Sequence, residues 1–365
     1  REDFSDHQLA VTGIANLESV RNRFLPIHRA EVINRLIALQ FGRGFRLCQK
    51  SQKDQRPSWE KKESAIHGTN RNHRHQQELP QRHMDFIDLK AQYKKFEPAI
   101  RERIDRVLEH GRFIMGPEVE ELEAVLANYV GCRHAITVAS GTDSLEIALR
   151  ALEIGPGDEV LTVPFTWIST AEVVLQVGAK PVFVDIDPLD FNIAVDQIEA
   201  AITPRTKALL PVSLFGQMPD YDAINAIAAK HGITVIEDAA QSFGATRHGR
   251  KSCGVTTIAS TSFYPAKPLG CYGEGGALFT NDEDLAMKMR AIRTHGGIRR
   301  HYHDLVGMNG RFDTLQAAIM LGKWPGFADE VVARGQLGAR YTEKLQDVCK
   351  TPEIREGNTH VYAQY

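Results

Sequence analysis

The feature that most constrains the fold of this chain is a regular alternation of short apolar runs with amphipathic helical stretches. Apolar runs that are separated by helices are typical of strands buried on both faces of a parallel sheet. The strand-like runs cover 134–139, 159–163, 181–186, 208–212 and 234–236, and the helical patterns between them cover 142–152, 168–177, 196–202 and 220–230. The sequence therefore predicts an α/β protein with a mainly parallel sheet between helices.

Further helices are expected on both sides of this region, and two more strands enclose a glycine-rich loop. The helical patterns cover 89–110, 117–130, 282–293 and 329–348, and the strands cover 258–263 and 276–280. We predict a large domain over 84–328 and the start of a smaller, incomplete domain over 329–365.

Residues 1–83 differ from the rest of the chain in composition. They hold 15 Lys and Arg against 9 Asp and Glu, whereas the remainder is acidic. The stretch 49–83 is almost entirely polar and cannot bury enough apolar surface to offset the entropy of ordering. We expect a basic leader that is disordered, or non-native sequence ahead of a start at Met84. A nucleic-acid-binding arm and a histidine-rich metal tract are the functional alternatives.

The composition argues against several classes of protein. No apolar stretch among the 365 residues is long enough for a membrane helix, and no signal-peptide pattern opens the chain. The five cysteines lack CxxC spacing, which argues against a disulfide framework or a zinc site and favours a reducing compartment. The net charge of −2 gives no general case for nucleic-acid binding. We expect a cytoplasmic protein without a membrane partner.

Ligands of open α/β sheets bind beyond the carboxyl ends of the strands, so the loops at these ends are the candidate site. The first strand runs through Ser140-Gly141-Thr142 directly into a helix, where free N–H groups and the helix dipole favour a phosphate. A plain helix cap without a ligand is the alternative. Trp167 follows the second strand and offers a flat wall for an aromatic ligand, although a core tryptophan is the more common arrangement.

Glu237 and Asp238 end the fifth strand, and a buried acid there requires a cation or hydrogen-bond donors. Because side chains alternate along a strand, the two carboxyls should point to opposite faces. We expect Asp238 to face the ligand crevice, with a helix cap or a structural salt bridge as the alternative.

Lys267 stands between Pro265 and Pro268 in the glycine-rich loop. A lysine with such rigid neighbours, close to a phosphate site and a buried acid, suggests an amine that forms a Schiff base. A solvated surface lysine is the alternative.

Together these residues predict a pyridoxal phosphate site. Ser262 would add a hydroxyl to the phosphate site at Ser140–Thr142, and Trp167 would stack on the ring. Asp238 would keep the ring nitrogen protonated, which makes the ring an electron sink. Lys267 would hold the aldehyde and, once displaced by a substrate amine, would act as the base that moves the proton.

The chain resembles the DegT/DnrJ/StrS family of sugar aminotransferases, a branch of the fold-type-I pyridoxal phosphate enzymes. The resemblance covers 85–365 and rests on motifs in register: SGTDSLEIAL, PFTW, KPVFVDID, PVSLFGQ, VIEDAAQSFGA, SFYPAKPLG, GEGGALFT and GMNGRFDTLQAA. It implies Lys267 as the Schiff-base lysine and Asp238 as the partner of the ring nitrogen. It further implies cofactor contacts for Gly141, Thr142, Trp167, Gln241 (near the ring 3-hydroxyl), Ser262 and Asn309. Asn309 would reach the neighbouring subunit's cofactor, so the resemblance implies a homodimer with shared active sites.

Within the family, the segment 295–303 and the GMNGRFDTLQAA motif are similar to enzymes acting on 3-keto UDP-sugar uronic acids. Those enzymes use glutamate to make the 3-amino sugar of bacterial O-antigen. A uronate and a diphosphate need cations, and Arg299, Arg300, His303 and Arg311 supply them in one stretch. A solvated basic loop is the alternative.

Three departures from the family pattern stand out. The family continues beyond Tyr365, the leader has no family counterpart, and Trp324-Pro-Gly-Phe327 stands where a helix-compatible segment is usual. The rival functions are a 4-keto nucleotide-sugar aminotransferase and a truncated, non-catalytic family member. A sugar dehydratase is a further rival, but such relatives carry histidine in place of the lysine at 267.

Overall fold

The computed structural model describes residues 87–297, 299 and 301–365. The leader predicted over 1–83 lies outside the described residues. The first two described helices, α3 (Leu89–His110) and α4 (Pro117–Val130), have the predicted bounds. Asp88 accepts a hydrogen bond from the Ala91 amide at the start of α3, and Gly111 ends it in the left-handed region with φ 67°. The local capping signals therefore set both ends of this helix.

The core is a seven-stranded sheet in the order β1-β9-β8-β5-β4-β2-β3. Strand β9 is antiparallel to both of its neighbours, and the other pairs are parallel. This confirms the predicted mainly parallel sheet between helices. The strands are β1 (His134–Val138), β2 (Glu159–Thr162), β3 (Lys180–Phe183), β4 (Thr206–Leu210), β5 (Thr234–Asp238), β8 (Ile258–Ser262) and β9 (Gly276–Thr280).

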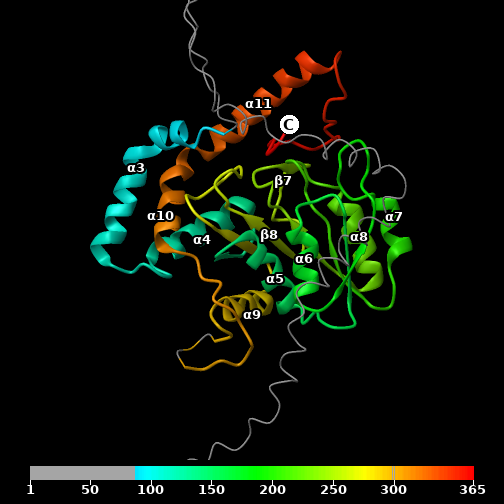
Figure 1. Cartoon of the computed structure of the whole chain (residues 1–365), viewed down its shortest axis with the longest axis horizontal. Helices are drawn as coiled ribbons and strands as arrows, with labels where there is room; N and C mark the ends of the chain where they lie inside the picture. The colour runs from blue at the N-terminus through cyan, green and yellow to red at the C-terminus, as the bar shows by residue number, and fades with distance from the viewer. Residues whose placement is uncertain (1–86, 298, 300) are drawn as a thin grey trace, which may run out of the picture. The chain divides into compact units, whose positions relative to one another are not determined.

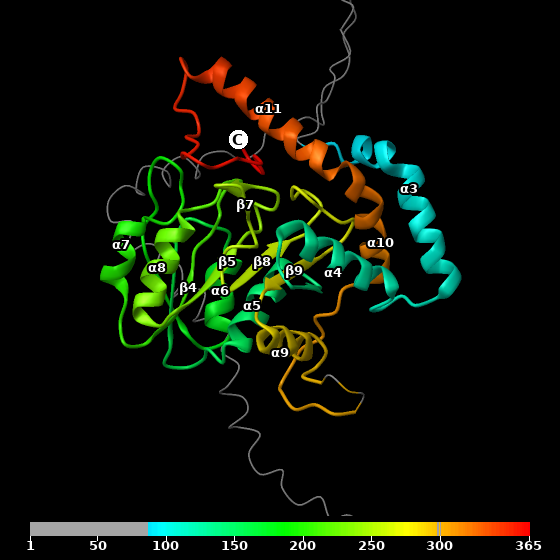
Figure 2. The same ribbon diagram turned by 180° about the vertical axis from the view of Figure 1, so that it is seen from behind.

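Helices cover both faces of this sheet (Figures 1 and 2). One face packs against α5 (Gly141–Ala151), α6 (Ser169–Gln176) and α9 (Glu283–Arg293). The other packs against α4 and α10 (Thr314–Lys323) at one end, and against α7 (Val195–Ala201) and α8 (Tyr221–His231) at the other. Alternation along β5 assigns Ile236 to the α5–α6–α9 face and Val235 to the α8 face.

Helix α10 and a short hairpin were not predicted. Helix α10 is buried almost all round, so it lacks the one-sided apolar pattern by which amphipathic helices are found. The short hairpin of β6 (Thr246–Arg247) and β7 (Arg250–Lys251) has only two residues in each strand, too few for a periodic pattern. Strand β3 (Lys180–Phe183) is shorter than the strand predicted over 181–186: it begins one residue earlier and ends three residues earlier.

A single 3-10 turn, η2 (Trp324–Gly326), joins α10 to α11 (Phe327–Leu345). Pro325 is tolerated there because it stands in the first turn, where its missing N–H has no partner to lose. Figure 1 shows α11 running along one edge of the domain, with the C-terminal segment returning beside it. The boundary between large and small domains at 328/329 stays a prediction. None of the helices in the described part of the chain is long and apolar enough to cross a membrane.

Candidate active site

The candidate site lies where the loops after β1, β5 and β8 meet. The close packing of Gly141 shows this, because a Cβ on Gly141 would stand 2.7 Å from the Cβ of Ser262. Only glycine therefore lets the start of α5 approach the end of β8. The structure thus brings the predicted phosphate-binding residues Gly141, Thr142 and Ser262 together from two distant segments.

The start of α5 has both a cap and free donors. Ser140 has the extended backbone of an N-cap, and its Oγ accepts a hydrogen bond from the Asp143 amide at 3.0 Å. Among the described residues, the amides of Gly141 and Thr142 donate to no partner. Free N–H groups at the positive end of a helix dipole are a site for an anion. The cap and the phosphate interpretations are therefore compatible here.

Asp238, the last residue of β5, is buried on the α5–α6–α9 side of the sheet with 4% of its surface exposed. Its Oδ2 accepts a hydrogen bond from the Thr170 hydroxyl of α6 at 2.8 Å, and its Oδ1 accepts one from the Ala240 amide at 3.1 Å. Burial raises the pKa of the Asp238 carboxyl, while these hydrogen bonds and the charge of Lys267 lower it. No cation among the described residues lies within ion-pair distance of this carboxyl. It can therefore accept a cationic ligand atom.

Glu237, the preceding residue, points to the opposite face, as the alternation predicts. It is fully buried and accepts hydrogen bonds from the hydroxyls of Ser213 and Ser252, at 2.9 and 2.7 Å, and from the Cys253 amide at 2.9 Å. Burial raises the pKa of Glu237 to about 7, although these hydrogen bonds lower it. Its partners all come from the protein, so Glu237 belongs to the structural core.

Lys267 lies in the loop between β8 and β9, half-buried. Its own amide donates to the Tyr264 carbonyl at 2.9 Å and closes a turn around Pro265. Burial lowers the pKa of the Lys267 ammonium, and the negative charge of Asp238 acts in the opposite direction. A lysine of lowered pKa has more neutral amine available as a nucleophile or base than a solvated one.

A second lysine, Lys323, is buried and holds the loop that carries Lys267 in place from the core. The ammonium of Lys323, in the last turn of α10, donates to the Gly270 carbonyl and lies 5.1 Å from the Tyr272 ring centroid. Burial lowers the pKa of Lys323 to about 8. Lys323 therefore supports the loop from the core, whereas Lys267 in the same loop is only half-buried.

Gln241 and Trp167 differ in how firmly they are held. The Gln241 Oε1 accepts a hydrogen bond from the Phe215 amide at 2.7 Å. Trp167, just before α6, has 73% of its surface exposed, so the core alternative for this tryptophan is wrong. Its indole is free to cover a flat ligand.

The predicted substrate residues lie on or next to the loop between α9 and α10. Asn309 Oδ1 accepts from Arg311 Nε at 2.9 Å, and the Gly310 carbonyl between them accepts from the Ala139 amide at 3.0 Å. This places Asn309 and Arg311 beside the end of β1, next to the start of α5.

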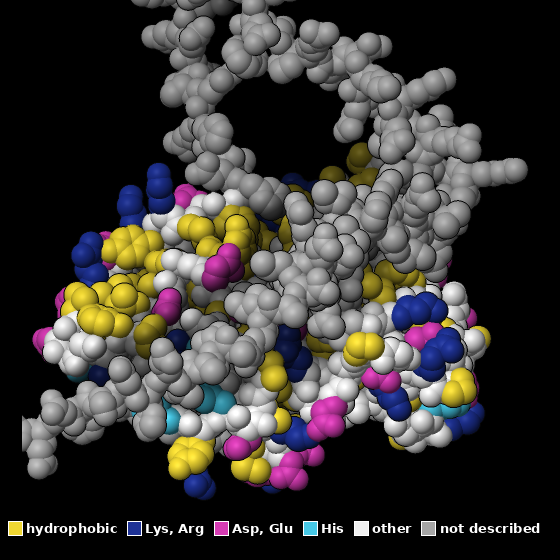
Figure 3. Space-filling view, turned by 60° about the horizontal axis from the view of Figure 1, so that its bottom comes forward, with side chains coloured by type: hydrophobic (Ala, Val, Ile, Leu, Met, Phe, Trp, Pro, Cys, Tyr) yellow, Lys and Arg dark blue, Asp and Glu magenta, His cyan; other side chains and the backbone are white. Residues whose placement is uncertain are grey.

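Arg299 and His303 lie earlier in this loop, closer to the end of α9, and both are exposed. Among the described residues, no hydrogen bond or ion pair joins either of them to the strand-end residues; His303 Nδ1 contacts the His295 carbonyl at 2.9 Å. Arg300 lies outside the described residues. Figure 3 views the side on which this loop projects in Figure 1, and hydrophobic, basic and acidic side chains are intermixed there.

Sequence reasoning missed three residues that hold the site: Thr170, Phe215 and Lys323. Thr170 follows Trp167 closely, so its place near a strand end was a usable signal. Phe215 contributes a backbone amide and Lys323 comes from the buried α10, and neither contact has a signature in the sequence.

A half-buried lysine of lowered pKa, a buried carboxyl group without an ion-pair partner among the described residues, and a helix start with free amides are the features expected of a pyridoxal phosphate aminotransferase. The comparisons agree. The model of the DegT/DnrJ/EryC1/StrS aminotransferase family matches residues 94–365, and this chain belongs to that family. It is a sugar aminotransferase, and enzymes of the family use pyridoxal phosphate.

Relatives and solved structures are similar over most of the chain. A UDP-2-acetamido-2-deoxy-3-oxo-D-glucuronate aminotransferase of Pseudomonas aeruginosa is 56% identical over 77% of this chain and 79% of its own length. A UDP-N-acetyl-3-dehydro-alpha-D-glucosamine 3-aminotransferase of Acidithiobacillus ferrooxidans is 43% identical over 76% of each chain. NtdA from Bacillus subtilis, solved with bound cofactor PMP, has a TM-score of 0.72 and 35% identity over 77% of this chain and 65% of its own.

Proposed function

We propose that this chain transfers the amino group of L-glutamate to a 3-keto UDP-sugar uronate, UDP-2-acetamido-2-deoxy-3-keto-glucuronic acid, for O-antigen synthesis in the cytoplasm. The carrying observation is a buried carboxyl group, Asp238, whose pKa the charge of the half-buried Lys267 acts to lower, together with the free amides at the start of α5, where Gly141 packs against Ser262. The choice of sugar is supported by the 56% identity to an aminotransferase named for a 3-oxo-glucuronate.

The residues fit the cofactor in charge and donor type. Pyridoxal phosphate supplies an aldehyde that condenses with amines and a ring that withdraws electrons. The amides of Gly141 and Thr142, with the Ser262 hydroxyl, would bind the phosphate. Asp238 would accept a hydrogen bond from the protonated ring nitrogen, and this cation would supply the ion-pair partner that the buried carboxylate lacks.

Lys267 would perform the proton transfer. Its amine would bind the aldehyde and, when a substrate amine replaces it, would be free to take a proton from the substrate carbon. The lowered pKa favours this role, because a larger fraction of the amine is neutral. Trp167, which is exposed just before α6, would cover the ring and exclude water from one face.

On the acceptor side, Arg311 would bind the uronate or the diphosphate, since a guanidinium can grip either in bidentate fashion. Arg299 and His303 would approach the nucleotide sugar from the exposed part of the loop. Arg311 stands nearest the strand ends, so it carries the largest expected effect of the three.

The first experiment is an absorbance spectrum of the protein with added pyridoxal phosphate, beside Lys267→Ala. We expect a visible band that requires Lys267 and bleaches with glutamate as 2-oxoglutarate forms. Borohydride reduction should leave the cofactor mass on the peptide that contains Lys267. A band without dependence on Lys267 would refute this role, and bound cofactor without 2-oxoglutarate would favour a non-catalytic protein.

The second experiment separates the acceptors. The glutamate-treated protein is offered 3-keto and 4-keto UDP-sugars, with and without the uronate, and return of the visible band is followed. We expect the 3-keto uronate to restore the band fastest and Arg311→Lys to slow this step without affecting the glutamate step. Preference for a 4-keto sugar would overturn the proposed substrate.

We also propose a homodimer in which Asn309 completes the partner's site. Asn309 is exposed, and Arg311 occupies only its Oδ1, which leaves its amide nitrogen available as a donor. Mixing Lys267→Ala with Asn309→Ala protein should restore about a quarter of wild-type activity, since half of the random dimers regain one site. Absence of recovery after subunit exchange would contradict shared sites.

A further inference from the structure

The loop Ser213–Gln217, which follows β4, lies between Gln241 and the C-terminal segment, defined as residues 353–362. On the side of the candidate site, the Phe215 amide donates to Gln241 Oε1 at 2.7 Å. Phe215 reaches this position with φ 57°, in the left-handed region that non-glycine residues rarely occupy. A strained backbone of this kind persists only where surrounding contacts hold it.

Those contacts come in part from the C-terminal segment. The Val361 amide donates to the Gly216 carbonyl at 2.9 Å. Gly216 has φ 125°, and a Cβ on it would stand 2.7 Å from the Tyr362 amide nitrogen. The C-terminal segment therefore packs directly on the residue that follows Phe215, at a distance that only glycine allows.

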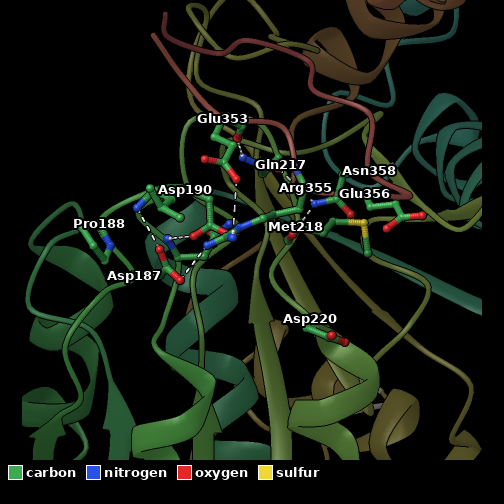
Figure 4. Close-up of polar contacts among 12 residues, drawn as sticks. Asp187, Pro188, Asp190, Gln217, Met218, Asp220, Glu353, Arg355, Glu356 and Asn358 are labelled. Carbon is green, nitrogen blue, oxygen red and sulfur yellow. Dashed lines mark hydrogen bonds and ion pairs between the residues drawn. The ribbon is translucent and has the colours of Figure 1, made fainter. Parts of the chain in front are cut away.

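Gln217 ties the same two segments together by its side chain, which is 2% exposed. Its Oε1 accepts from the Arg355 amide at 3.2 Å and from Asn358 Nδ2 at 3.1 Å, and its Nε2 donates to the Glu353 carbonyl at 2.8 Å (Figure 4). Every polar atom of this buried amide is thus used on the C-terminal segment.

Arg355 anchors the C-terminal segment to the edge of the sheet. Its guanidinium pairs with Asp187 at 2.6 Å and Asp190 at 2.8 Å, both in the loop that follows β3 (Figure 4). Phe191 in that loop also packs against Phe215, with ring centroids 5.7 Å apart. The β3 loop, the C-terminal segment and the Phe215 loop therefore form one connected cluster.

The hydrogen bond from the Phe215 amide determines which end of the Gln241 side-chain amide points toward Phe215. A peptide N–H can only donate, so Gln241 must present its carbonyl oxygen to Phe215. The NH₂ group is then the part of the amide left to donate to an anionic oxygen of a ligand.

We propose that the C-terminal segment, anchored by Arg355 and Gln217, acts through Phe215 to orient the Gln241 amide as a donor toward the ring oxygen of the cofactor. This inference rests on the proposed function for the cofactor contact of Gln241. Arg355, Gln217 and Phe215 are positioning residues; the motif KPVFVDID supplies Asp187 of the cluster, and PVSLFGQ supplies Phe215 and Gln217.

The test uses the full chain and the variants Arg355→Ala, Asn358→Ala and Gln241→Ala. The matched control is Arg250→Ala, which removes an exposed ion pair with Asp222 and leaves the C-terminal segment intact. Arg355→Lys keeps the charge and serves as the rescue variant.

The first readout is amide hydrogen exchange of the peptide containing Phe215, in cofactor-free protein. We expect exchange about tenfold faster in Arg355→Ala, a smaller rise in Asn358→Ala, and wild-type exchange in Arg250→Ala. Unchanged exchange in Arg355→Ala would overturn the coupling. This readout does not depend on the cofactor, so it decides the coupling even if the proposed function fails.

The second readout is the pH midpoint of the Lys267-dependent visible band after addition of pyridoxal phosphate. Gln241→Ala and Arg355→Ala should shift this midpoint in the same direction by about half a pH unit or more, with no further shift in the double variant. Arg355→Lys should restore most of the wild-type midpoint. A shift in Gln241→Ala with a wild-type midpoint in Arg355→Ala would overturn the inference.

Discussion

Two buried carboxyl groups, Glu237 and Asp238, stand next to each other at the end of β5 and have opposite surroundings. Glu237 faces α8 and accepts three hydrogen bonds from the protein, which enclose it completely. Asp238 lies on the α6 side and accepts two, and the charge of Lys267 acts to lower its pKa. Burial raises the pKa of both groups, so burial alone does not distinguish a functional carboxyl. The two carboxyl groups differ in whether the protein itself supplies all of their hydrogen-bond and charge partners.

The comparison predicts its largest effect in cofactor binding. Asp238→Asn removes the charge that would face the ring nitrogen, whereas Glu237→Gln is equally conservative on the other face. Removing one partner of a buried charge pair costs about 2–5 kcal/mol, so affinity for pyridoxal phosphate should fall about 30- to 5,000-fold in Asp238→Asn. A spectroscopic titration measures this. Equal losses in both variants would mean that the two faces are not functionally distinct.

Glu237 is expected to make stability depend on pH. Its pKa of about 7 in the folded state lies above the ordinary value of 4.5, so the folded protein binds this proton more tightly than the unfolded chain. The stabilisation is therefore fully present below about pH 4.5 and is lost as the pH rises through about 7.

Urea unfolding of cofactor-free protein tests this. Relative to Glu237→Gln, which has no such proton, the wild-type free energy of unfolding should fall by about 3 kcal/mol across this pH range. Parallel pH profiles of the two proteins would show that Glu237 does not titrate in the folded state.

Thr170→Val tests the surroundings of Asp238 alone. The substitution preserves shape but removes the hydroxyl that donates to Asp238 Oδ2. Loss of a hydrogen bond to a charged group costs about 1.5 kcal/mol, so cofactor affinity should fall about tenfold. Isothermal titration with pyridoxal phosphate measures the change. Wild-type affinity would indicate that Asp238 does not depend on this donor.

Ser213→Ala gives the smallest effect and the complementary result on the α8 side. It removes one donor to Glu237 and the contact of that hydroxyl with the Tyr221 hydroxyl at 3.0 Å. We expect a loss of about 1 kcal/mol in the free energy of unfolding with cofactor affinity unchanged. A drop in affinity comparable to that of Thr170→Val would contradict the separation of the two faces.

The sequence predicted the local elements well where a pattern of period 2 or 3.6 exists. Helices α3 and α4 have the predicted bounds because capping residues and one-sided apolar patterns are local properties. Helix α10 was not predicted, because a helix buried almost all round has no polar face that would reveal a helical period in the sequence.

The candidate site likewise has features that the sequence predicted and contacts that only the structure shows. Alternation along a strand predicted that Glu237 and Asp238 diverge, and the chemistry of Lys267, Asp238 and the start of α5 suggested the cofactor class. The roles of individual site residues stay predictions until the experiments above are done. What no pattern showed is the support of the site: the Lys323 contact beneath the Lys267 loop and the Phe215 amide on Gln241.

The sequence by itself therefore determined the α/β class, the order of most elements and the residue types expected at the site. These follow from backbone geometry and side-chain alternation, which act over a few residues. Only the tertiary structure decided which carboxyl is enclosed, which loop meets which helix start, and which distant segments hold Gln241. Those outcomes depend on hydrogen bonds and close packing between segments far apart in the chain, and local periodicity carries no information about them.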